Sequence, residues 1–211
     1  MYEIGVEELH QLLLDGLSAS RYAIANYDSL AERKCKYTLY GPSCHWLGVS
    51  IPSTLIPTRA RKLTQKTRRK DYVIYELDES FRILRTIHML DYTRIDCTYH
   101  HFDLNGVHYA YPFRGNGNQR YNGEIAVMKY ADDRPVCFGL IRKPLLFMQF
   151  YEYTTQNHMT VSTYRYWPTA EYTRHGYPVD KNAPIGAPNS CVQRHCREET
   201  PAITDFSRWI K

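Results

Sequence analysis

The chain has 211 residues, 43% of them hydrophobic, which excludes a disordered protein and allows one large domain or a domain with appendages. Its net charge is +5, yet residues 33–70 carry ten lysines and arginines and no acid, so the remainder is about −5. Because clustered cations gain affinity by releasing phosphate counterions, this asymmetry indicates a polyanionic partner.

The sequence predicts a cytoplasmic protein without a membrane-spanning segment. Charged residues interrupt the first apolar cluster, and no run approaches the roughly 18 apolar residues of a membrane span. In this compartment the six cysteines are expected to be reduced thiols or metal ligands.

Residues 1–33 are predicted to form a pair of helices. Apolar residues from Val6 to Leu17 recur at helical spacing, and Gly16 is expected to end the first helix. Ser18 or Ser20 would cap the second. This is the outline of a helix-turn-helix, whose second helix would read base edges with Ser18, Ala19, Ser20 and Arg21. The alternative is a helical hairpin packed on a sheet.

Residues 34–71 are predicted to form a basic strand and loop segment. In its second part, the cationic segment Arg59–Lys70, seven of twelve positions are lysine or arginine. Such a stretch adds little to a core and suits phosphate binding, although a solvated face is the plainer interpretation. Tyr37, Tyr40 and Trp46 nearby could stack unpaired bases or belong to the core. The candidate phosphate contacts are Arg59, Arg61, Lys62, Lys66, Arg68, Arg69 and Lys70.

Residues 72–167 are predicted to form an antiparallel β-meander. Alternating apolar segments recur about every ten residues, and Asn105-Gly106 is the strongest hairpin signal, since both residues tolerate positive φ. This spacing favours a barrel-like or strongly bent sheet. Residues 168–211 are rich in proline and are expected to form an extended tail with a short terminal helix near residues 203–210. The predicted fold class is therefore α+β.

A first candidate site follows from the predicted hairpin. With Asn105-Gly106 as a two-residue turn, Asp103 stands opposite His108, and His101 lies on the same face two residues back. Opposed Cβ atoms come within about 5 Å, so two histidines and a carboxylate could form a metal or acid/base site. The alternative is the ordinary solvated face of an antiparallel sheet.

A second candidate site is formed by cysteines. Cys35 and Cys44 lie in one loop region and Cys191 and Cys196 in the tail, so the two pairs could bind a structural zinc that anchors the tail. Neither spacing is the tight C-x2-C knuckle, and buried free cysteines are the alternative. No other cofactor is predicted.

Three functions remain open. The leading hypothesis is a non-enzymatic cytosolic protein that binds nucleic acid, or a nucleoprotein complex, through the cationic segment. The second is a protein-interaction or inhibitor module whose cationic segment docks on an acidic groove of a partner and blocks it. The third is a metal-dependent hydrolase that acts on a phosphorylated substrate through His101, Asp103 and His108.

Overall fold

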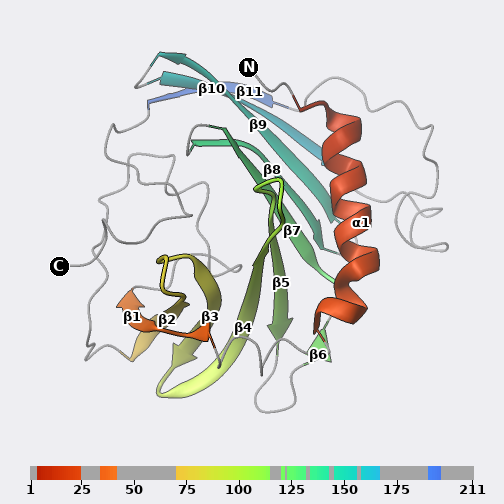
Figure 1. Cartoon of the computed structure of the whole chain (residues 1–211). Coiled ribbons are helices and arrows are strands. Elements are labelled where there is room, and N and C mark those ends of the chain that lie inside the picture. Colours follow the sequence, from red (N-terminus) through yellow and green to blue (C-terminus); the bar gives the residue numbers. More distant parts are fainter. Residues whose placement is uncertain are drawn as a thin grey trace.

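The computed structural model describes residues 4–24, 34–41, 70–114, 120–121, 123–131, 134–142, 145–155, 158–166 and 190–195. These ranges contain one long helix and one antiparallel sheet (Figure 1). The helix is α1 (Val6–Ile24). The strands are β1 (Tyr37–Gly41), β2 (Asp71–Leu77), β3 (Ile83–Leu90), β4 (Thr93–Phe102), β5 (His108–Arg114), β6 (Arg120–Tyr121), β7 (Ile125–Ala131), β8 (Arg134–Arg142), β9 (Leu145–Thr155), β10 (His158–Tyr166) and β11 (Ser190–His195).

The strands lie in the sheet in the same order as in the chain. The order is β1-β2-β3-β4-β5-β7-β8-β9-β10-β11, and β6 pairs beside β5. The predicted antiparallel meander is thereby confirmed. The sheet is strongly curved (Figure 1). Among the described residues, however, β1 and β11 are the two ends of the order and do not pair with each other, so no closed barrel forms.

The predicted helix pair is wrong, because α1 continues through Gly16. Gly16 belongs to a buried stripe with Leu9, Leu13 and Ser20, which recur at helical spacing along one side of the helix. A Cβ atom on Gly16 would lie 2.4 Å from Cδ1 of Ile125. The glycine therefore lets the helix approach the sheet closely and does not end it.

The two serines expected to cap a second helix make bonds within the first. Ser18 Oγ donates to the carbonyl oxygen of Leu14 at 2.9 Å, and Ser20 Oγ donates to that of Leu17 at 2.6 Å. Such bonds to the preceding turn are what these side chains form inside a helix. The helix-turn-helix interpretation is wrong for the same reason, since residues 18–21 lie within α1.

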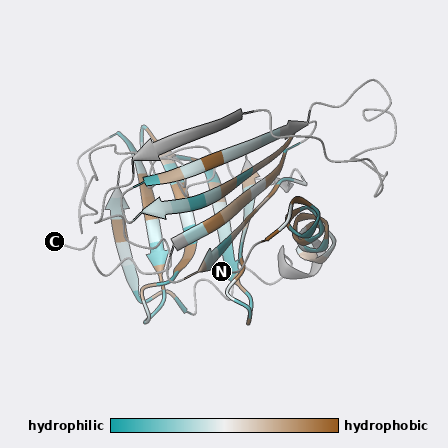
Figure 2. Ribbon diagram, turned by 90° about the horizontal axis from the view of Figure 1, so that it is seen from above, coloured by the Kyte–Doolittle hydropathy of each residue, from teal (hydrophilic) through white to brown (hydrophobic). Residues whose placement is uncertain are grey.

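The sheet buries both of its faces. The helix lies against one face, where it contacts β7 and β8 (Figure 2). Apolar residues there include Leu9, Leu13, Ile125, Val127 and Ile141. The core on the opposite face joins β1–β3 to β7–β10 and includes Leu39, Val73, Tyr75, Met128 and Leu140. Each such side chain contributes about 1.5–3 kcal/mol when fully buried.

The predicted tail contains a strand. β11 pairs with β10, with Val192 opposite Val161. The segment Ser190–His195 has no regular alternation of apolar and polar residues, so the sequence pattern did not predict a strand there. The predicted terminal helix near residues 203–210 lies outside the described residues. Within the described ranges, no helix combines the length and the apolar character that crossing a membrane requires.

Candidate functional site

Both ends of the region that contains the cationic segment lie side by side at one edge of the sheet. β1 is the end strand of the sheet, and its last residue, Gly41, pairs with Val73 of β2. The connection between β1 and β2 therefore leaves and returns at this edge, which we call the β1–β2 edge. Six of the predicted phosphate contacts belong to this connection and lie outside the described residues: Arg59, Arg61, Lys62, Lys66, Arg68 and Arg69.

Three further cations lie at the two ends of β1 and β2. Lys34 and Lys36 are exposed just before β1. The backbone of Lys36 is fixed there, since its N–H donates to the carbonyl oxygen of Leu77 at 2.8 Å. Lys70, the last residue of the cationic segment, has its Nζ atom 3.5 Å from Oδ1 of Asp91. The charge of Lys70 is therefore already balanced by a carboxylate of the same chain.

The aromatic residues beside the cationic segment have partners within the fold. Tyr37 stacks on Phe81, with ring centroids 4.4 Å apart and planes 11° from parallel. The ring of Tyr40 lies 6.0 Å from that of Tyr72. These contacts favour the interpretation that the two tyrosines help to build the sheet edge. Trp46 lies outside the described residues.

The predicted convergence of His101, Asp103 and His108 is wrong. The observed register places His108 opposite Phe102, and His101 opposite Tyr109. His108 therefore points to one face of the sheet, where it is buried, while His101 is exposed on the other.

The shift has a physical cause in the turn. The N–H of Asp103 donates to the carbonyl oxygen of Val107 at 3.0 Å, so the loop has three residues and ends in Gly106, with φ of 74°. Oδ1 of Asp103 accepts hydrogen bonds from the N–H groups of Asn105 and Val107, each at 2.8 Å. This carboxylate therefore holds the turn together and has a structural role.

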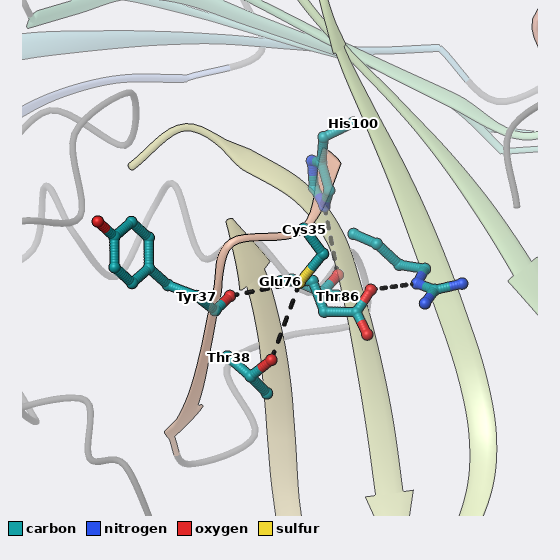
Figure 3. Close-up of polar contacts among 7 residues, drawn as sticks. Cys35, Tyr37, Thr38, Glu76, Thr86 and His100 are labelled. Carbon is teal, nitrogen blue, oxygen red and sulfur yellow. Dashed lines mark hydrogen bonds and ion pairs between the residues drawn. The ribbon is translucent and has the colours of Figure 1, made fainter. Parts of the chain in front are cut away.

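A chain of hydrogen bonds crosses four neighbouring strands on the buried face that His108 shares. Nε2 of His100 lies 3.3 Å from Oγ1 of Thr86 (Figure 3), and Nδ1 of His100 lies 2.9 Å from Nε2 of His108. Nδ1 of His108 in turn lies 3.2 Å from the hydroxyl of Tyr130. The ring of His108 also stacks on Phe102 at 4.3 Å. We call Thr86, His100, His108 and Tyr130 the buried histidine chain.

Both imidazoles of this chain are neutral at ordinary pH. His100 and His108 are 3% and 2% exposed. Burial, and to a smaller extent the charge of His101, lowers the pKa of His108 to about 3. Burial and the charge of His108 hold the pKa of His100 well below its ordinary value. Neutral rings can order the bonds in either direction, and the chain joins side chains of four strands on one buried face of the sheet.

Two of the four candidate zinc ligands, Cys35 and Cys191, lie among the described residues. Cys35, before β1, has its Sγ atom 3.6 Å from the carbonyl oxygen of Tyr37 and 3.8 Å from Oγ1 of Thr38 (Figure 3). Cys191 lies in β11, at the other end of the sheet order. Cys44 and Cys196 lie outside the described residues. Within the described ranges, no group of three or more histidine, cysteine, aspartate or glutamate residues could hold a metal ion.

Comparison of the chain with models of protein families, with curated proteins and with solved structures finds no match.

Proposed function

We propose that the protein is a non-enzymatic nucleic-acid-binding protein whose contact surface is the cationic segment at the β1–β2 edge. The observation that carries this proposal is the stretch of residues 33–70, which holds ten cations and no carboxylate. Each phosphate that such a stretch neutralises releases counterions, and affinity grows with the number of contacts.

The topology supports the proposal. Because Gly41 and Val73 are paired, the two ends of the β1–β2 connection are fixed side by side at one edge of the sheet. Lys34 and Lys36 add two exposed cations just before β1, at the other end of this strand. A nucleic-acid backbone can contact many cations of the segment at once, whereas a single small anion can contact only a few of them.

Salt dependence tests the proposal directly. Fluorescence anisotropy would follow the binding of labelled duplex DNA, single-stranded DNA and RNA at 50 and 200 mM salt. If the six cations between Arg59 and Arg69 each contact a phosphate, the salt slope is about −5 and affinity falls about 10³-fold between the two conditions. Replacement of all six by glutamine should remove most of this slope.

A matched control separates charge from side-chain identity. The variant with lysine at Arg59, Arg61, Arg68 and Arg69 keeps every charge of the segment and should keep the salt slope. Lys70 stays unchanged in both variants, because Asp91 already pairs with it. Equal affinity of the wild type and the glutamine variant, or no micromolar binding to any of the three nucleic acids, would refute the proposal and direct the search to an acidic protein partner.

A further inference from the structure

One arginine of the sheet has a guanidinium edge that no residue of the described structure satisfies. Arg94, near the start of β4, is half-buried. Its Nε and Nη2 atoms are buried and have no hydrogen-bond partner in the described part of the chain. These two atoms carry the parallel N–H groups on one edge of the guanidinium plane, the pair that binds two oxygens of one carboxylate or phosphate.

An irregularity in the strand pairing directs this edge. Met89 of β3 pairs with Arg94 and His88 pairs with Asp96, so the intervening Ile95 has no partner in β3. Such an extra residue shifts the alternation of side chains by one position. Arg94 can therefore lie on the same face as Cys97, three residues along the strand.

Arg94 shares its surroundings with a buried ion pair and a thiol. Arg85 of β3 is paired with Glu76 of β2, with Nε and Oε2 2.5 Å apart, and their side chains are only 9% and 14% exposed (Figure 3). Burial raises the pKa of the Cys97 thiol to about 11, while the nearby charges of Arg94 and Arg85, and hydrogen bonds from Arg94 and Tyr99 to the thiolate form, act in the opposite direction. The thiol is thus neutral, and the cluster holds two cations and one carboxylate.

We propose that the Nε and Nη2 edge of Arg94 binds an oxyanion, either a phosphate or a carboxylate group, with its two oxygens side by side. Two buried N–H groups without hydrogen-bond partners are unfavourable, and here they belong to a positively charged group. An oxyanion that accepts through two oxygens satisfies both N–H donors of Arg94. Its negative charge also balances the one positive charge that remains after Glu76 pairs with Arg85. The inference uses residues of β2–β4 and does not depend on the cationic segment.

Calorimetric titration tests the site with two probes, inorganic phosphate and acetate, at pH 7 and at ionic strength fixed with chloride. We expect one equivalent of at least one probe to bind the wild-type protein, and the probe that saturates identifies the group. Arg94→Gln should abolish this binding. Arg94→Lys, which keeps the charge but lacks the parallel donors, should weaken it at least tenfold.

Two controls keep the test decisive. Arg82→Gln removes the same charge from an exposed turn between β2 and β3 and should leave binding unchanged. The Nε–H resonance of Arg94 in the wild-type protein should shift on titration, a readout that does not depend on the folding of any variant. If neither probe gives saturable binding, or if Arg94→Gln binds as tightly as the wild type, the proposal is overturned.

Discussion

The buried histidine chain predicts that the protein loses stability in mild acid. An unfolded histidine has a pKa near 6.5, whereas that of His108 is about 3 in the folded chain. Stability is therefore complete above pH 6.5 and is lost progressively as the pH falls from 6.5 toward 3, because only the unfolded state takes up the proton. Between pH 7 and pH 5 this lowers the free energy of unfolding by about 2 kcal/mol for His108 alone. His100 acts in the same direction.

Urea unfolding followed by circular dichroism at pH 7 and pH 5 measures this loss. His108→Gln keeps a hydrogen-bonding group but removes the titration, so the difference between the two pH values should shrink by about 2 kcal/mol. His101→Gln, on the exposed face of the neighbouring strand β4, should change the difference far less, because the charge of His101 is the smaller cause of the low pKa of His108. The reasoning would be refuted by an equal pH dependence in His108→Gln and wild type. A loss of about 2 kcal/mol is a large fraction of the 5–15 kcal/mol that stabilises a typical domain.

Two further predictions concern single residues that position the sheet. Gly16→Ala should lower the free energy of unfolding by about 1–2 kcal/mol in a urea titration, because overpacking against Ile125 outweighs the gain in helix propensity. Gly5→Ala is the control, since its added methyl group would meet open space, and it should be nearly neutral in the same titration. Asp103→Ala should lower the melting temperature by loss of two turn hydrogen bonds, about 1 kcal/mol, and Asp103→Asn, which keeps the acceptor oxygen, should largely restore it. If the alanine variant melts as the wild type does, the carboxylate has no structural role.

Much of the sheet could be predicted from the sequence, but its register could not. Alternation of apolar residues located the strands between residues 72 and 167, and Asn105-Gly106 located the hairpin between β4 and β5. The register depends on how many residues the turn contains, and the side chain of Asp103 selects three where the dipeptide predicts two. A shift of one residue moves the side chains of a strand to the opposite face of the sheet. In this protein it placed His101 and His108 on opposite faces.

The length of the helix α1 is a second feature that the sequence pattern did not predict. Glycine near the end of an apolar run predicts a stop, yet the stripe of Leu9, Leu13, Gly16 and Ser20 continues through it. That continuity was visible in the sequence. The need for a small residue at Gly16 was not, because Ile125 and Tyr109, which approach it, come from distant strands. The hydrogen bonds of His100 could not be predicted from the sequence either, because its partners Thr86 and His108 lie on neighbouring strands and come close only in the folded sheet.

The sequential strand order also bears on how the chain folds. Neighbours such as β3 and β4, or β8 and β9, are joined by two-residue connections, and pairings of low sequence separation form quickly. The end pairs must instead close over residues 42–70 and 167–189, which carries a larger entropic penalty. We therefore expect the central hairpins to form while residues 168–211 are still being synthesised. The two edges should join last and be the first to exchange their amide hydrogens.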